Sequence, residues 1–232
     1  MPTVGFLMDD LSEQARFHWD ALPGAGYVKF AYDFPVIREI IPGATEQRNI
    51  DSGGDLTQTP AVVETARKLE KRGAGLISSD TGFMALYQEE VCKAVSVPVA
   101  LSSLLQVPLI WRLVGKERRI GIITWSQKFL GELHFNAAGW SSNDIPVVVG
   151  KGLDEFPVWK KQIYNPEMFD ELEAAPVAIA RELLEQHPDI GAFVFECAGL
   201  PGYGRSVQQA TGLPVYNLVT LMRMMFSGIC FM

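Results

Sequence analysis

The chain has 232 residues, 48% of them hydrophobic and 20% charged, and its formal net charge at pH 7 is −7. This length can bury the cores of one large domain or of two small ones. A pI of about 5.0 and the lack of a basic stretch argue against a nucleic-acid-binding surface. The negative charge does not attract anions over long range, so any bound carboxylate must be held by local dipoles.

Cysteine and histidine are sparse, and neither shows the spacing of a disulfide framework or a metal site. We therefore expect a reducing compartment and no metal site. No basic segment followed by an apolar one opens the chain, and the longest apolar stretch, residues 95–111, is interrupted by prolines and polar residues. These features predict a cytoplasmic protein without a membrane span. The three cysteines are Cys92, Cys197 and Cys230.

Short apolar runs alternate with amphipathic stretches along the first half, which is typical of an α/β fold with mainly parallel strands. Thr59 and Pro60 mark a helix start, and the helix that follows buries one face. The predicted strands are residues 4–8, 75–79 and 97–100, with weaker ones at 27–34 and 36–41. The other predicted helices are residues 12–21, 83–94 and 103–114.

A charged connection at residues 115–119 separates the halves, and the second half repeats the order of the first. The predicted strands are residues 120–124, 146–149, 192–195 and 213–216. The predicted helices are residues 128–138, 169–186, 203–211 and 218–226. Residues 150–166 are the least regular part, and we expect them to form either a lid over a cleft or a surface excursion.

The two halves resemble each other at an offset of 116 residues without a gap. The same offset places Asp80 and Thr81 opposite Glu196 and Cys197, each pair at the end of an apolar run. Identical pairs at this offset are Gly75/Gly191, Tyr87/Tyr203, Val91/Val207, Ala94/Ala210, Pro98/Pro214 and Val99/Val215.

The repeat predicts two similar three-layer α/β domains, residues 1–115 and 116–216, related by a pseudo-twofold axis. The helix at residues 217–232 is expected to pack back on the first domain. Ligands of open α/β sheets collect beyond the carboxyl ends of the strands. We therefore expect the active site in the cleft between the domains, with Thr81 and Cys197 facing one bound molecule.

Cys197 is the strongest candidate for chemistry, because small residues follow it and let the backbone approach a ligand. A helix N-terminus beyond this turn predicts a lowered thiol pKa. The alternative is that Cys197 only fills space at a strand end. Thr81 is either its partner or a helix cap. Glu196 and Asp80 are expected to point to the other side of their strands.

Four segments resemble the aspartate/glutamate racemase superfamily, which includes hydantoin racemases, maleate isomerases and arylmalonate decarboxylases. They are SSDTGFMALYQEEV, VPVALSSLLQVPLI, RRIGIIT and FECAGLPGYGRSVQQATGLPVYNLVTL. The resemblance implies two α/β domains, no cofactor, and proton transfer at the carbon α to a carboxylate. Cys197 matches one family cysteine, and Thr81 stands where the other usually is.

The resemblance also implies which groups hold the substrate carboxylate. The backbone N–H groups of Gly82, Phe83, Ala198 and Gly199 would bind its oxygens. Ser126 is a further donor by position, although it serves equally well as a helix cap.

Thr81 argues against a racemase that uses two equivalent thiols, because a hydroxyl is a far weaker acid than a thiol. We expect a cofactor-independent racemase or isomerase with Cys197 as acid/base and Thr81 as its partner. A decarboxylase of malonate-like acids, an isomerase or lyase in which Cys197 is the nucleophile, and a small-acid binder without catalysis remain alternatives. The expected partner is a small carboxylic acid, with a homo-oligomer also allowed.

Overall fold

Two parallel sheets form the centre of the structure, a computed structural model that describes residues 1–22, 24–28, 31–51 and 53–229. The first sheet has the order β2-β1-β3 and the second β5-β4-β6-β7. The first sheet consists of β1 (Thr3–Met8), β2 (Val36–Ile40) and β3 (Ala74–Ser79). The second consists of β4 (Arg119–Ile123), β5 (Val147–Val149), β6 (Ile190–Phe195) and β7 (Val215–Tyr216).

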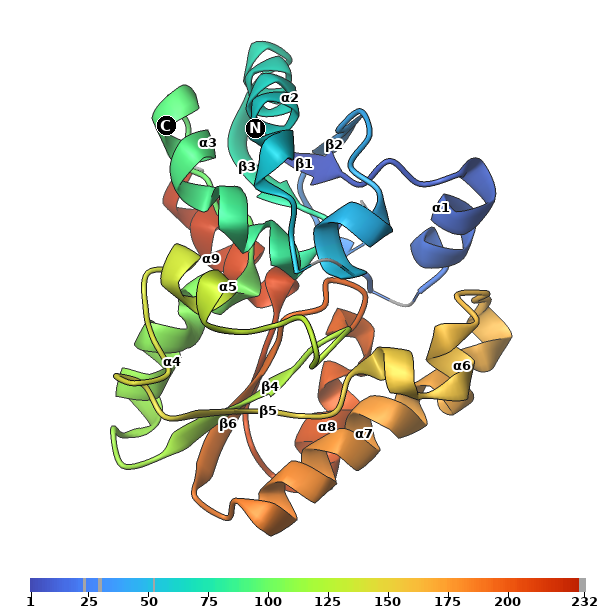
Figure 1. Cartoon of the computed structure of the whole chain (residues 1–232), viewed down its shortest axis with the longest axis vertical. Helices are drawn as coiled ribbons and strands as arrows, with labels where there is room; N and C mark the ends of the chain where they lie inside the picture. The colour runs from blue at the N-terminus through green and yellow to red at the C-terminus, as the bar shows by residue number, and fades with distance from the viewer. Residues whose placement is uncertain (23, 29–30, 52, 230–232) are drawn as a thin grey trace.

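Helices cover both sheets, as expected for buried parallel strands. Figure 1 shows α2 beside the first sheet and α7 and α8 beside the second. The first-half helices are α1 (Glu13–Asp20), α2 (Thr59–Lys71), α3 (Gln88–Ala94) and α4 (Val107–Val114). The second-half helices are α5 (Glu132–Ala137), α6 (Pro157–Lys160), α7 (Phe169–Gln186), α8 (Gly204–Thr211) and α9 (Leu218–Ile229). The predicted α/β class with parallel sheets is confirmed.

The sequence repeat is reproduced in the register of the strands. Val4 of β1 pairs with Leu76 of β3, and the residues 116 positions later, Ile120 and Ala192, pair in the same way. In both strand pairs the register shifts just before these residues, between Thr3 and Val4 and between Arg119 and Ile120. Backbone hydrogen bonds repeat too, since Ile77 donates to the Pro98 carbonyl at 3.0 Å and Phe193 to that of Pro214 at 2.9 Å. The two halves are therefore copies of one backbone plan.

Most predicted elements are present, but some differ. The described residues of 27–34 form turns rather than a strand, and residues 97–100 make only a single bridge between Ile77 and Val99. The predicted helix at 83–94 begins as a 3-10 turn, η4 (Gly82–Tyr87), before α3. The two segments that were expected to be strands are short, and their apolar residues are buried without pairing in a sheet.

Helix α9 contacts both β3 and β7, and its Phe226 stacks on Phe34 at 3.9 Å between ring centroids. The domain boundaries at residues 115 and 216 stay predictions. Cys230 and the end of the predicted 217–232 helix lie outside the described residues. Among the helices described, none combines the length and apolar character needed to span a membrane.

The irregular segment 150–166 is tied to the first half of the chain. Its Trp159 and Tyr164 are fully buried. His18 Nδ1 donates to the Tyr164 carbonyl at 3.0 Å, and Gln162 Nε2 donates to Glu46 Oε1 at 2.7 Å. The segment thus bridges from the second sheet to α1 and to the loop after β2.

Candidate functional site

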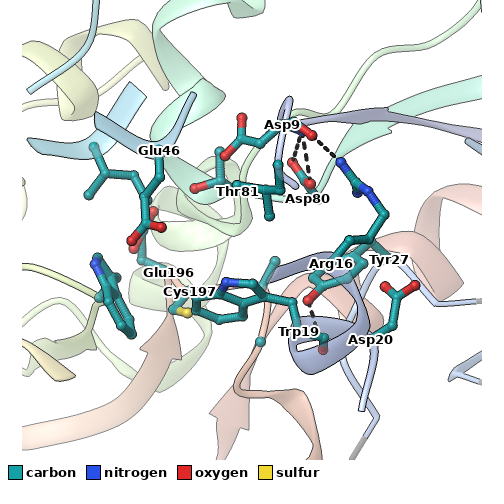
Figure 2. Close-up of a pocket in the computed structure, with 15 residues that line it drawn as sticks. Asp9, Arg16, Trp19, Asp20, Tyr27, Glu46, Asp80, Thr81, Glu196 and Cys197 are labelled. Carbon is teal, nitrogen blue, oxygen red and sulfur yellow. Dashed lines mark hydrogen bonds between the residues drawn. The ribbon is translucent and has the colours of Figure 1, made fainter. Parts of the chain in front are cut away.

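A cavity of about 520 Å³, part of it open to solvent, lies beyond the carboxyl ends of β1, β3, β4 and β6 (Figure 2). Parallel strands bring their ends to one edge, which is why residues far apart in sequence meet there. The cavity is lined by Asp9, Leu11, Arg16, Trp19, Asp20, Tyr27, Glu46, Ile50, Asp80, Thr81, Trp125, Glu196, Cys197, Ala198 and Gly199.

Equivalent backbone hydrogen bonds hold the two predicted reactive positions. Asp80 N–H donates to the Leu7 carbonyl at 3.0 Å, and Glu196 N–H donates to the Ile123 carbonyl at 2.8 Å. Thr81 and Cys197 follow these anchors, and both line the cavity. The structure therefore brings the predicted pair to one cavity.

The thiol of Cys197 is 8% exposed, and burial raises its pKa well above the ordinary range. The charge of Glu196 acts in the same direction, while a hydrogen bond from the Gly199 backbone opposes both. The predicted lowering of the pKa is therefore wrong. Helix α8 begins only at Gly204, after an intervening turn, so its N-terminus does not offset the burial.

Thr81 occupies the N-cap position of η4, but its side chain accepts no capping hydrogen bond. The Thr81 hydroxyl therefore does not cap the helix, which was the alternative role predicted for it. Ala198 and Gly199 line the cavity. Gly82 and Phe83 are buried beside it without lining it, although the first N–H groups of a helix have no intrahelical partner.

Ser126 does not reach the cavity. Its side chain is 1% exposed, and its hydroxyl has no hydrogen-bond partner among the described residues. The neighbouring Trp125 lines the cavity instead.

Asp80 and Glu196 both line the cavity, so the expectation that they point away is wrong. β3 ends at Ser79 and β6 at Phe195. The alternation of side chains across a sheet no longer applies beyond the last strand residue. The cavity therefore contains two carboxyl groups in addition to the predicted Thr81 hydroxyl and Cys197 thiol.

Burial raises the pKa of both carboxyls to about 7. For Asp80 the backbone N–H of Asp9 acts against burial, contacting the two carboxylate oxygens at 3.1 and 3.0 Å. For Glu196 the Thr124 hydroxyl does so, donating to Oε2 at 2.8 Å. Glu196 Oε1 has no partner within the described part of the chain, although it is buried.

Several lining residues were missed by the sequence reasoning. Arg16 and Trp19 come from α1, and Glu46 from the loop after β2. The sequence predicts the helix at residues 12–21, but nothing in its pattern indicates a site. Asp9 is another lining residue; it is 4% exposed, and its Oδ1 accepts from Asn49 Nδ2 at 2.5 Å.

Aromatic rings form one wall of the cavity. The rings of Trp19 and Trp125 meet edge to face, with centroids 5.3 Å apart, and Trp19 also contacts Tyr164 at 5.2 Å. Within the residues described, no group of histidine, cysteine and carboxylate side chains has an arrangement that would hold a metal ion. The cavity therefore combines a thiol, carboxyl groups, one arginine and an aromatic wall.

No family model matches the chain. Among curated proteins it is similar to a dimethylsulfoniopropionate lyase of Durusdinium sp. clade D, with 28% identity over 215 residues, which covers 88% of this chain and 69% of the relative. It is also similar to dimethylsulfoniopropionate lyase 6 of Emiliania huxleyi, with 25% identity over 233 residues, which covers 89% of this chain and 60% of the relative. The chain thus spans 60% to 69% of the length of these two relatives.

Three solved structures share the fold over nearly the whole chain. A sulfate-associated mutant of arylmalonate decarboxylase has a TM-score of 0.65 at 20% identity, covering 98% of this chain and 94% of its own. The allantoin racemase from Klebsiella pneumoniae has a TM-score of 0.66 at 12% identity, covering 100% and 89%. An aspartate racemase homologue from Pyrococcus horikoshii OT3 has a TM-score of 0.58 at 16% identity, covering 98% of both chains.

Proposed function

From the fold that this chain shares with the aspartate/glutamate racemase superfamily, we propose that it is a lyase acting α and β to a carboxylate. It removes the α-proton and expels a leaving group from the β-carbon. Dimethylsulfoniopropionate, named in the curated relatives, is the substrate to test first.

The observation that carries this proposal is the asymmetry of the cavity. One strand end presents the thiol of Cys197, and the equivalent end presents only the hydroxyl of Thr81. Racemisation needs a proton donor and a proton acceptor on opposite faces of one carbon, and a threonine hydroxyl is poorly matched to either role near neutral pH. An elimination needs a single base, which Cys197 supplies.

The Cys197 thiolate takes the α-proton, and the electrons of the C–H bond become the Cα=Cβ double bond. The Cβ–S bond breaks and its electron pair leaves with the sulfur. The products are acrylate and dimethyl sulfide, and the thiol then releases its proton to water to restore the thiolate.

A cationic substrate supports ionisation of this buried thiol. Burial and Glu196 both raise the pKa of Cys197, so the thiolate form needs a compensating positive charge. The sulfonium group supplies it when the substrate is bound. The Gly199 N–H stabilises the thiolate, while the Ala198 N–H and the Thr81 hydroxyl stabilise the charge that develops on the carboxylate oxygens.

The test is direct. Purified protein is incubated with dimethylsulfoniopropionate in D₂O, dimethyl sulfide is measured by gas chromatography, and acrylate is measured by NMR. We expect both products from the wild type, a greatly reduced rate from Cys197→Ala, and undiminished turnover after dialysis against EDTA.

Other outcomes overturn the proposal and identify an alternative. Exchange of the α-hydrogen of a small amino acid or hydantoin, without dimethyl sulfide, indicates a racemase. Release of CO₂ from a malonate with uptake of one deuterium indicates a decarboxylase. Thermal stabilisation by dicarboxylates without any turnover indicates a binding protein.

A further inference from the structure

We propose that a second cavity, bordered by α8 and α9, binds a phosphate group through Arg205, Arg223 and Asn217. This cavity has a volume of about 690 Å³, part of it open to solvent, and shares none of its described lining residues with the cavity that holds Cys197. The inference does not depend on the proposed function. It gives the chain a separate site for an oxyanion, either inorganic phosphate or the phosphate group of an organic ester.

The charge of the cavity wall provides the first argument. Arg205 and Arg223 line the cavity, and no described carboxylate does. Both arginines are exposed, and neither forms an ion pair with a described residue. In a chain of net charge −7, this wall thus carries two positive charges without a counter-ion. Guanidinium groups match the geometry of a phosphate, and two of them match the charge of a phosphate monoester.

The side-chain amide of Asn217 provides the second argument. Asn217 lines the cavity and is only 6% exposed. Its Oδ1 accepts from the N–H groups of Val219 and Thr220 at 3.0 and 3.2 Å, which fixes the orientation of the amide. The Nδ2 group has no hydrogen-bond partner among the described residues, and it is not one of the unpartnered atoms sealed from solvent. A nearly buried donor that stays accessible without a partner points to an acceptor supplied by a ligand.

The start of α8 lies beside this amide. A methyl group added at Gly204, the first residue of α8, would lie 3.5 Å from Asn217 Nδ2, and Gly204 also lines the cavity. The N-terminus of a helix carries a partial positive charge, which favours an anion. Glu173 accepts from the Ser206 hydroxyl in the same turn but does not line the cavity. The helix N-terminus that follows Cys197 in the sequence therefore lies at this second cavity.

The two guanidinium groups remain available to a ligand. Arg223 Nη2 donates to the carbonyl of Ala31, another lining residue, at 3.4 Å. This bond keeps the side chain at the cavity and leaves its other N–H groups free to donate. Arg205 follows Gly204 in α8, and its side chain has no partner among the described residues. Donors from α8 and from α9 can therefore meet on one phosphate group.

The experiment measures the binding of inorganic phosphate and of phenyl phosphate by calorimetry, at low ionic strength where screening is weak. We expect the wild type to bind both. Arg205→Gln and Arg223→Gln should each raise the dissociation constants by about fivefold or more. Asn217→Asp keeps the oxygen that accepts from α9 and replaces the free donor with a negatively charged oxygen, so it should abolish binding.

Two control variants locate the site. Arg112→Gln removes a positive charge from the exposed surface of α4, and Arg16→Gln removes the arginine that lines the cavity of Cys197. Both should leave the dissociation constants unchanged. Circular dichroism verifies the folding of each variant. If Asn217→Asp does not fold, the Arg205 and Arg223 variants decide, because both of these side chains are exposed.

The outcomes are distinct. Absence of binding to the wild type, or equal losses in Arg112→Gln and in the cavity variants, would overturn the site. A loss confined to Arg16→Gln would place the anion in the other cavity and would also overturn it. When the site is confirmed, equal affinities identify the free ion as the ligand. Tighter binding of phenyl phosphate identifies an ester, whose organic part would contact the apolar lining residues Pro201, Val215 and Val219.

Discussion

The strand ends that the two halves contribute to the cavity have equivalent backbone hydrogen bonds but different side chains. Positions 116 residues apart hold Asp9 and Trp125, Asp80 and Glu196, and Thr81 and Cys197. In the first half, the Asp80 carboxylate is satisfied by the N–H of Asp9. In the second half, Glu196 keeps one buried oxygen without a partner among the described residues, beside a thiol. A repeated scaffold can thus hold a structural carboxylate at one end and reactive groups at the other.

The largest expected effect separates Cys197 from Thr81. Cys197→Ala should lower turnover by about 10²–10⁴-fold, because it removes the base. Thr81→Ala should lower it less than about 10-fold, since only one hydrogen-bond donor is lost. Initial rates of dimethyl sulfide release check this, with circular dichroism to verify folding. Equal losses in the two variants would show that both halves take part in proton transfer.

Gly82→Ala tests how closely the strand ends approach. A methyl group at this position would overlap Oε1 and the carbonyl oxygen of Glu196, and the backbone cannot move aside freely. We expect a loss of about 1–3 kcal/mol in the free energy of unfolding, measured by urea denaturation. Gly131→Ala is the control, because nothing lies within 4 Å of its added methyl group. A Gly82→Ala protein as stable as this control contradicts the contact.

Glu196 also predicts a dependence of stability on pH. Its pKa rises from 4.5 to about 7 on folding, so its favourable contribution is complete below about pH 4.5 and is lost as the pH rises to about 7. The loss is roughly 3 kcal/mol at most, since each pKa unit corresponds to about 1.4 kcal/mol. Denaturation of wild type and Glu196→Gln at pH 5 and pH 8 should show the wild type losing more. If the free energy of unfolding changes equally with pH in the two proteins, the pKa of Glu196 is not raised on folding.

The smallest expected effect concerns the pH profile of turnover. The raised pKa of Cys197 means that the thiolate fraction, and with it elimination, grows as the pH rises. Glu196→Gln removes a negative charge beside the thiol and should shift the profile toward lower pH. Asp80→Asn should leave its position unchanged, because the charges that raise the pKa of the Cys197 thiol are those of Glu196 and Glu46 and not that of Asp80. A rate that falls with rising pH would instead indicate a thiol acting as proton donor.

The fold class could be predicted from the amino-acid sequence, and so could the position of Thr81 and Cys197 at one cavity. Apolar runs and amphipathic stretches are local patterns, and the gapless repeat requires equivalent strands to end at equivalent places. Both features could therefore be predicted from the sequence without a structure. The strand predicted at residues 27–34 failed because burial in a turn produces the same hydrophobic pattern as a strand.

The other groups near the thiol could not be predicted from the sequence, because their positions depend on how distant segments pack together. Glu46 and Trp19 arrive from a loop and from α1, and no spacing in the sequence relates them to Cys197. The direction of the Cys197 pKa also depends on burial by distant segments, which outweighs the nearby N–H of Gly199. Asp80 and Glu196 turned toward the cavity because each lies just past the last residue of its strand, where alternation no longer governs direction.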